Sequence, residues 1–410
     1  MAANRKRRLK VLHAPHDVGG NAYYLARAER AYGFDSSNLV YAKQWFGYPA
    51  DYHLDLDPFA SPMRYRRWWL LMAKVALSYD VLHFNFGVSF LTHVPFRWIL
   101  PDLPLWRNLG LATFITFQGC DSRISRYVMQ YLEPKICANC PQRQGVCQPF
   151  YDDFKLEIIT EALRYADRVF ALNPDLLHNI PGGYFLPYAN CDLDDWQPPH
   201  GYDWHHSGPV RVLHAPTSQE LKGSSHIIAA VEALRAEGEN VELVLVENVP
   251  HGQVKELYES ADLLVDQVLA GWYGGLAVEL MALGKPVIAY LRQEDLGFIP
   301  AEMRADLPII NADAATLKET LREFIHDTER RQRAGAQSRA YVEKWHHPRV
   351  VAGITTAMYR QAVERRSGNR GSLKRLHILL KLAKPTLNSF RLIYGNNSAL
   401  PSYITNWLGK

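Results

Sequence analysis

The sequence predicts two α/β domains in succession, each a parallel sheet covered by helices. Short apolar runs alternate with stretches of helical periodicity along the whole chain, which is typical of parallel sheets. The strand-like segment VRVLHAP at 210–216 repeats the opening segment KVLHAP after a stretch rich in Pro, Gly, Asp and His. The length of 410 residues suits two domains of ordinary size.

In the first half, a strand over 9–15 should end at the glycine-rich turn HDVGGN, and a helix should follow over 22–34. Further strands are expected at 37–42, 80–86, 112–118 and 167–173. The segment RYRRWWLLMAKVAL at 64–77 is interpreted as a core helix with a basic outer face. A membrane-interface patch around Trp68 and Trp69 is the alternative.

In the second half, strands and helices continue to alternate. Strands are expected at 210–216, 241–247, 262–268, 285–290 and 307–311, and helices at 224–238, 252–260, 276–284, 317–336 and 348–365. The last helix is long enough to cross back to the first domain. We therefore divide the chain into domains at 1–195 and 208–347, a returning helix at 348–366 and a tail at 367–410, with a Cys-rich insertion at 120–147.

Cations gather at both ends of the chain. Residues 1–10 carry five basic groups and residues 365–410 carry nine, and neither segment contains Asp or Glu. This distribution suits an anionic membrane surface better than a nucleic-acid groove. The tail segment SLKRLHILLKLAK predicts a basic amphipathic helix, which would either bind such a surface or dock on the protein itself.

Neither a membrane-spanning helix nor a secretory signal is expected. No run of eighteen apolar residues occurs, and the basic start leads into only a short apolar stretch. We expect a cytoplasmic protein, either free or peripheral on the inner face of the cell membrane.

Four of the five cysteines lie close together in the sequence, at Cys120, Cys137, Cys140 and Cys147. A C-x2-C pair with two further thiols nearby could supply the ligands of a tetrahedral structural zinc. An iron–sulfur cluster would use the same ligands, and one or two disulfides or unpaired thiols are the other interpretations. Cys191 stands apart and is expected to be a buried thiol.

The second half resembles the nucleotide-sugar-binding domain of glycosyltransferase family 4, which has the GT-B fold. The motifs are ELKGSSHIIAAVEALRAEG at 220–238 and ADLLVDQVLAGWYGGLAVELMALGKPVIAY at 261–290. The first half agrees more loosely, through VGGN, TFQGCDSR and ADRVFALNPDLL. The resemblance covers roughly residues 10–365.

The resemblance implies two Rossmann-like domains whose parallel sheets face each other across a cleft. It also implies a retaining enzyme that moves a sugar from a nucleotide-diphosphate donor to a hydroxyl of a glycan or lipid-linked acceptor, in the synthesis of cell-envelope or extracellular polysaccharide. Orientation and leaving-group stabilisation can supply the catalysis, so no catalytic metal is expected.

The donor residues come from the two motifs of the second half. Gly274 and Gly275 precede a helix, where unpaired backbone N–H groups and the helix dipole favour a diphosphate. By the resemblance, Glu279 would accept hydrogen bonds from the ribose diol, and Lys222 would neutralise the diphosphate leaving group.

In the first half, Gly19 and Gly20 match the family's glycine loop, which faces the donor phosphate and the acceptor. Gln118 stands where the family has a histidine, and it can hydrogen-bond a sugar hydroxyl but cannot carry a proton. Asp121 and Arg123 are interpreted either as acceptor contacts or as ordinary polar loop residues.

Three histidines lie at or near strand ends. His13 and His83 are interpreted as structural. For His16, which lies in the glycine loop, a catalytic role is the alternative to a structural one.

The chain departs from the family pattern at two further positions. Gly271 stands where the family has a second glutamate, and Thr217 where it has an arginine. Only one strand–helix unit separates the lysine helix from the strand at 262–268, which leaves the nucleotide base open. A catalytically silent GT-B protein that binds a glycan or nucleotide sugar, or that partners an active transferase, is therefore a second interpretation. A sugar-phosphate epimerase-like enzyme is a third.

Overall fold

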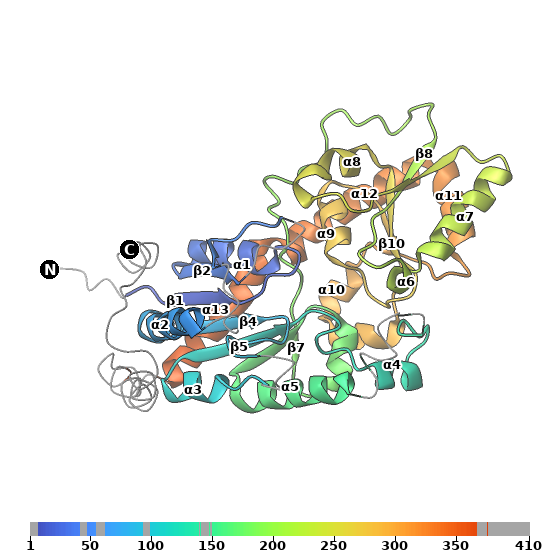
Figure 1. The fold of residues 1–410 in the computed structure, drawn as a ribbon. Helices are drawn as coiled ribbons and strands as arrows, with labels where there is room; N and C mark the ends of the chain where they lie inside the picture. The colour runs from blue at the N-terminus through green and yellow to red at the C-terminus, as the bar shows by residue number, and fades with distance from the viewer. Residues whose placement is uncertain are drawn as a thin grey trace.

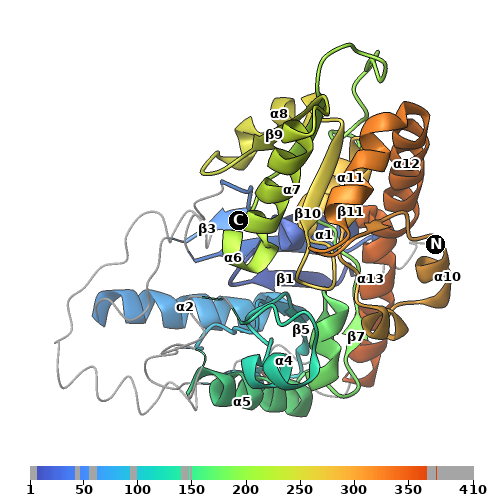
Figure 2. The ribbon, with the colours of Figure 1, turned by 90° about the vertical axis from the view of Figure 1, so that its right-hand side faces the viewer.

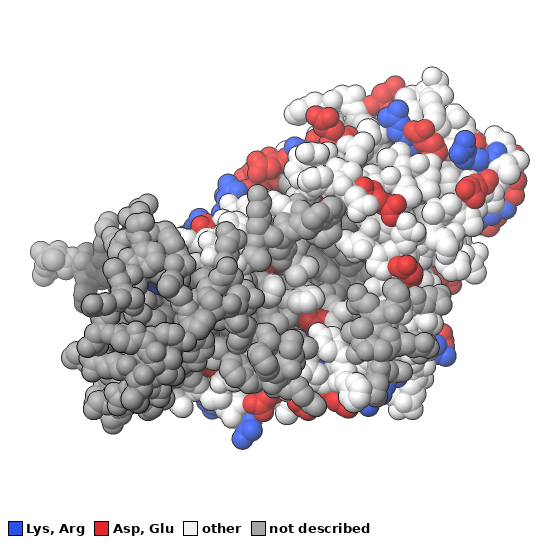
Figure 3. All heavy atoms as spheres, viewed as in Figure 1, with Lys and Arg blue, Asp and Glu red and all other residues white. Residues whose placement is uncertain are grey.

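The computed structural model describes residues 7–41, 47–54, 62–92, 99–138, 140, 147, 150–366 and 375. Two sheets of parallel strands lie in two lobes joined by the chain, with helices packed around each sheet (Figure 1). The α/β architecture predicted from the alternating pattern is confirmed. On the face in Figure 3, cations and acids are mixed over the described surface of the second lobe.

The first sheet has seven strands in the order β3-β2-β1-β4-β5-β6-β7. Its central strands β4 and β5 are buried at every position, as expected for a parallel sheet covered on both faces. The strands are β1 (Lys10–Ala14), β2 (Asp35–Val40), β3 (Tyr52–His53), β4 (Val81–Asn85), β5 (Ala112–Phe117), β6 (Arg168–Ala171) and β7 (Tyr184–Phe185).

The α-helices of the first lobe are α1 (Asn21–Glu29), α2 (Pro62–Ser78), α3 (Leu103–Asn108), α4 (Ser125–Tyr131) and α5 (Tyr151–Tyr165). The α-helix expected over 22–34 ends at Glu29, and a 3-10 turn continues it through Tyr32. In α2, Trp68 is fully buried and its indole N–H donates to the Tyr41 hydroxyl over 3.1 Å. The membrane-interface alternative for 64–77 is therefore wrong at Trp68, and the side chain of Trp69 lies outside the described residues.

The second sheet has five strands in the order β12-β11-β10-β8-β9. Its strands are β8 (Val210–His214), β9 (Val241–Leu245), β10 (Leu263–Gln267), β11 (Val287–Ala289) and β12 (Ile310–Asn311). Its α-helices are α6 (Gln219–Lys222), α7 (Ser224–Ala236), α8 (Lys255–Ser260), α9 (Gly275–Ala282), α10 (Ala301–Ala305), α11 (Leu317–His326) and α12 (Thr328–Tyr341).

The helix expected over 317–336 is two helices. Asp327 separates α11 from α12, and its side chain accepts a hydrogen bond from the backbone N–H of Arg330, which caps α12. An aspartate that caps a following helix competes with continuation of the preceding one.

The last described helix, α13 (Pro348–Arg365), packs on the first lobe (Figure 2). Tyr359 packs edge-on against Phe114 of β5, with ring centres 4.7 Å apart. The Tyr359 hydroxyl pairs with Nδ1 of His83, and Thr355 donates to Glu29 over 2.9 Å. The first sheet is thus covered on one face by a helix from the far end of the chain.

Within the described part of the chain, no helix combines the length and the apolar character that a membrane span requires.

Candidate functional site

The turn before α9 brings a lysine, a glycine N–H and a buried carboxylate together. Gly274 caps α9, and its N–H donates to Oδ2 of Asp266 over 2.7 Å. Lys222 donates from Nζ to Oδ1 of the same carboxylate over 2.6 Å. A Cβ added to Gly274 would lie 3.3 Å from this Nζ. The positive charge of Lys222 and the N-terminus of α9 therefore lie next to each other, where both would attract an anion.

The turn after Lys222 holds this lysine against β10. Gly223 has a φ of +76°, and a Cβ there would lie 2.6 Å from Cγ2 of Val268. The backbone N–H of Val268 donates to the carbonyl oxygen of Lys222 over 3.1 Å. Only glycine allows this left-handed turn to approach Val268 so closely. Close packing therefore explains why glycine follows the lysine in the KG motif.

Glu279 lies one turn into α9 and is buried. Its Oε1 pairs with Nε2 of His251 at 2.9 Å and accepts a longer hydrogen bond from Asn190 at 3.4 Å. Asn190 also donates to the carbonyl oxygen of Gly275 over 3.1 Å. Burial raises the pKa of the Glu279 carboxyl, while the two hydrogen bonds oppose that shift.

Aromatic rings from both lobes surround this carboxylate. The rings of Tyr48 and His251 are 4.2 Å apart, and Trp196 lies on His251 at 5.7 Å. Burial raises the pKa values of Tyr24 and Tyr48, and the charge of Glu279 adds to both shifts, after that of Cys191 in the case of Tyr24. The site therefore offers flat apolar surfaces next to a hydrogen-bond acceptor.

The glycine loop of the first lobe reaches the same rings. Gly19 and Gly20 have φ values of +67° and +73°, which strongly favour glycine. A Cβ on Gly20 would lie 2.9 Å from Tyr48 and 3.0 Å from Tyr24. Next to the loop, Asp17 accepts the backbone N–H groups of two α1 residues, and burial raises its pKa to about 6.

Of the three histidines predicted near strand ends, His13 and His83 are buried and bonded to other side chains. His13 pairs with the buried Glu29 at 3.0 Å. Burial lowers the pKa of His83, which lies between Tyr359 and Thr116. His16 is exposed beside the glycine loop.

Gln118 follows β5 at the carboxyl edge of the first sheet. Its carbonyl oxygen accepts from Asn173 over 2.6 Å, and the Tyr188 hydroxyl donates to Asn173 over 2.7 Å. Burial, and then the charge of Asp266, raise the pKa of Tyr188. The Gln118 side-chain Nε2 is buried and has no acceptor among the described residues. Hydrogen bonds thus join Gln118, Asn173 and Tyr188.

Asp121 and Arg123 are bonded within the first lobe. The Asp121 carboxylate accepts the backbone N–H groups of Gln118 and Gly119, and Arg123 donates from Nε to Asp175 over 2.7 Å. These bonds favour the loop-residue interpretation over direct contact with an acceptor.

The structure shows what stands at the two further departures from the family pattern. Gly271 has a φ of +79°, and a Cβ there would lie 2.5 Å from Nη1 of Arg292. A glutamate would not fit unless Arg292 moved. Arg292 pairs with Asp295 at 2.7 Å and donates to the carbonyl oxygen of Glu133 in the first lobe. Thr217 is exposed in the loop before α6.

The four clustered cysteines are free thiols, as is the buried Cys191. Lys155 lies 3.7 Å from the sulfur of Cys147, and Arg123 lies 4.0 Å from that of Cys120. Cys137 is buried, which raises the pKa of its thiol to about 12. In the described residues no three Cys, His, Asp or Glu side chains are arranged as metal ligands, so the structure gives the zinc prediction no support.

Sequence reasoning missed three polar residues of this site, namely Asp266, His251 and Asn190. They lie in different segments, and only folding brings them to Lys222 and Glu279. The one available signal was Asp266, a charged residue inside the otherwise apolar strand LLVDQ.

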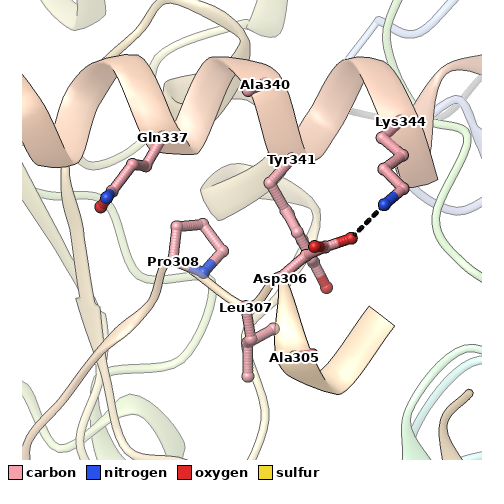
Figure 4. A pocket seen from close by; sticks show the side chains of 8 residues that line it. All are labelled: Ala305, Asp306, Leu307, Pro308, Gln337, Ala340, Tyr341 and Lys344. Carbon is pink, nitrogen blue, oxygen red and sulfur yellow. Dashed lines mark ion pairs between the residues drawn. The ribbon is translucent and has the colours of Figure 1, made fainter. Parts of the chain in front are cut away.

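A pocket of about 380 Å³ lies between α10 and α12 (Figure 4). Lys344 and Asp306 form an ion pair across it at 2.7 Å. None of the predicted site residues lines it. The remaining lining residues are Ala305, Leu307, Pro308, Gln337, Ala340 and Tyr341.

No protein-family model and no curated protein matches the chain. Solved structures do. Sucrose-phosphate synthase from Thermosynechococcus elongatus aligns with a TM-score of 0.55 and 16% identity over 87% of this chain and 99% of that chain. HepE from Anabaena, in complex with UDP and glucose, aligns with a TM-score of 0.57 and 12% identity over 86% and 100%.

An alpha-glucosyltransferase in complex with UDP and a 13-mer DNA aligns with a TM-score of 0.51 and 12% identity over 86% of this chain and 99% of that chain. At these identities the likeness concerns the fold. With its two parallel sheets in two lobes, the chain has the GT-B fold of these structures.

Proposed function

We propose that this protein is a glycosyltransferase that moves a sugar from a nucleotide-diphosphate donor to a hydroxyl of a glycan or lipid-linked acceptor. The observation that carries the proposal is the convergence of the Lys222 ammonium and the Gly274 N–H at the N-terminus of α9, about one turn from Glu279. A cation and a helix N-terminus suit a diphosphate, and a buried carboxylate suits a diol.

Each part of the donor would have a place in this arrangement. The diphosphate would lie at Gly274 and Gly275 with Lys222 beside it. The ribose would bind Glu279, whose Oε1 is now paired with His251. The rings of Tyr48 and His251 would offer the base a stacking surface. The solved complexes of HepE with UDP and with UDP-glucose support a nucleotide-sugar ligand for this fold.

The acceptor would approach from the first lobe. The buried Nε2 of Gln118 has no acceptor among the described residues, and it could donate to a sugar hydroxyl. Lys222 would stabilise the charge that develops on the leaving diphosphate. Retention by front-face attack requires no enzymatic nucleophile, so it is compatible with glycine at position 271.

A donor screen tests this function against its alternatives. Purified protein would be incubated with UDP-, GDP- and ADP-sugars and a cell-envelope extract, and released nucleotide and labelled glycan would be measured. Release with transfer supports the proposal. Binding without transfer or hydrolysis favours the silent binder or partner subunit, and an altered sugar without net nucleotide release favours the epimerase-like enzyme.

Glu279→Ala should mainly raise the donor KM, because the carboxylate would hold the ribose in both the ground and the transition state. Loss of a charged hydrogen bond costs about 1.5–3 kcal/mol, which corresponds to roughly 10- to 150-fold in KM. Steady-state kinetics at varied donor concentration would measure it. Glu302→Ala, on the exposed start of α10, is the control and should leave KM unchanged. A normal KM in Glu279→Ala would contradict the assignment.

The structural zinc at Cys120, Cys137, Cys140 and Cys147 stays a prediction. Freshly purified reduced protein should carry about one zinc per chain, and Cys140→Ser should lower thermal stability more than activity per folded molecule, since structural zinc contributes to folding. Metal analysis measures the first and thermal unfolding the second. Iron in place of zinc would indicate a cluster, and absence of both metals would end the proposal.

The cationic tail would bring the protein to an anionic membrane surface, in line with cell-envelope or extracellular polysaccharide synthesis. Apart from Arg375, residues 367–410 lie outside the described residues. Removing them should weaken sedimentation with phosphatidylserine vesicles, at about 1 kcal/mol for each cation near the surface. Unchanged sedimentation would contradict this role, and unfolding of the shortened chain would make the tail a structural element.

A further inference from the structure

The two groups that would bind the donor diphosphate are both bound by Asp266. Its Oδ1 accepts from Lys222 over 2.6 Å, and its Oδ2 accepts from the Gly274 N–H over 2.7 Å. The carboxylate is fully buried, while Lys222 retains 19% side-chain exposure. The two carboxylate oxygens of Asp266 therefore accept hydrogen bonds from the two groups that would bind an anionic ligand.

The Asp266 carboxylate makes the contacts that a phosphate would make with the same two groups. Two oxygens of one anionic centre take an ammonium and the N–H at a helix N-terminus, which are the contacts of many phosphate sites. A Cβ on Gly274 would lie 3.6 and 3.9 Å from the two Asp266 oxygens, so the turn and the carboxylate are already close to contact.

A diphosphate in this place would add negative charge beside a buried carboxylate. At about 4 Å two like charges repel by several kcal/mol in a medium of intermediate polarity. The Gly274 N–H has one proton and can donate fully to only one of the two anions, and Lys222 would have to divide its N–H donors between them.

We propose that Asp266 is an internal substitute for the donor diphosphate, whose carboxylate holds Lys222 and the Gly274 N–H until the diphosphate replaces it. This inference rests on the proposed function. It gives Asp266 two effects: it keeps Lys222 directed at the glycine turn, and it weakens the hold of the site on a nucleoside diphosphate. The second effect would favour release of the nucleotide product.

Affinity for UDP tests the proposal. Isothermal titration in EDTA would compare wild-type protein with Asp266→Asn, which keeps the shape of the side chain and removes its charge. We expect UDP to bind the variant about tenfold more tightly or better, because the repulsion and the competition for Lys222 are gone. Asp266→Ser, shorter and also neutral, should show the same direction if the asparagine variant folds poorly.

Two further variants separate competition from general effects. Asp262→Asn removes another buried carboxylate, just before β10, which pairs with Tyr202, His206 and the N–H of Arg211, whereas Lys222 pairs with Asp266. It should leave UDP affinity unchanged. In a Lys222→Ala background, the gain from Asp266→Asn should shrink, because the two anions would no longer compete for the ammonium.

The outcomes are distinct. Tighter UDP binding by Asp266→Asn or Asp266→Ser supports the proposal. If wild-type protein binds UDP and neither variant binds it more tightly, Asp266 is not a competitor, and the proposed function still stands. If UDP binds wild-type protein only when Mg²⁺ replaces the EDTA, and Asp266→Asn abolishes that binding, Asp266 is a metal ligand and the proposal is overturned. If neither wild-type protein nor variant binds UDP, GDP or ADP, the donor site fails and the inference fails with it.

Discussion

Replacing Lys222 by alanine is expected to lower kcat by about a hundredfold or more, with a smaller change in donor KM. The ammonium would oppose negative charge that grows on the diphosphate as the glycosidic bond breaks, so its contribution is larger in the transition state than in the ground state. Steady-state kinetics with saturating donor would measure the loss.

The variant needs a folding control, because Lys222 also pairs with the buried Asp266. Removing one partner of a buried pair leaves an uncompensated charge. Thermal unfolding and UDP binding should therefore be measured on the same preparation. Lys255→Ala, which removes a half-exposed lysine of α8, should leave kcat unchanged. A folded Lys222→Ala protein with normal kcat would show that the diphosphate lies elsewhere.

Gly335→Ala is expected to lower the free energy of unfolding by about 2–3 kcal/mol. Gly335 lies in α12, where it packs on the end of α9, and an added Cβ would lie 2.1 Å from the carbonyl oxygen of Gly284. A methyl group there must push the two segments apart, which exceeds the gain in helix propensity. Moving α12 would also displace Arg339, which donates a hydrogen bond to the carbonyl oxygen of Ala282 at the end of α9.

Denaturant unfolding would measure this loss, with Gly297→Ala as the matched control. A Cβ on Gly297 would meet no atom within 4 Å, so its substitution should change stability by less than about 0.5 kcal/mol. Equal stability of the Gly335 and Gly297 variants would mean that α12 and α9 do not approach each other this closely in solution.

The local pattern was enough to predict most strands and the fold class. Buried parallel strands are short and apolar, so segments such as ATFITF of β5 are visible without any contact information. The glycine turn at Gly274 was also predictable, from the order and spacing of the motifs along the chain rather than from the glycine pair alone. The resemblance then predicted Lys222 and Glu279. In the structure Lys222 lies beside Gly274 at the start of α9, and Glu279 lies about one turn further along this helix.

The partners of these two residues could not be predicted, because they depend on non-local contacts. His251 lies in the short segment after β9 and contacts Glu279, and Asp266 of β10 contacts Lys222 at the end of α6. Trp68 shows what local pattern could decide only in part. The core-helix interpretation of 64–77 is confirmed at Trp68, which is buried and donates a hydrogen bond to Tyr41, whereas the neighbouring arginines had left a membrane surface as the alternative.

The packing of α13 on the first sheet sets an order for synthesis of the chain. Residues Val351, Ala352, Tyr359, Ala362 and Val363 share one apolar cluster with Val11, Val81, Phe114 and Phe170. A ribosome makes these α13 residues long after it has made β5, at 5–20 residues per second roughly ten seconds or more later. Until α13 has been made, the nascent first lobe therefore exposes an apolar face, which chaperones can bind. A truncated chain that ends before residue 348 would keep this face exposed.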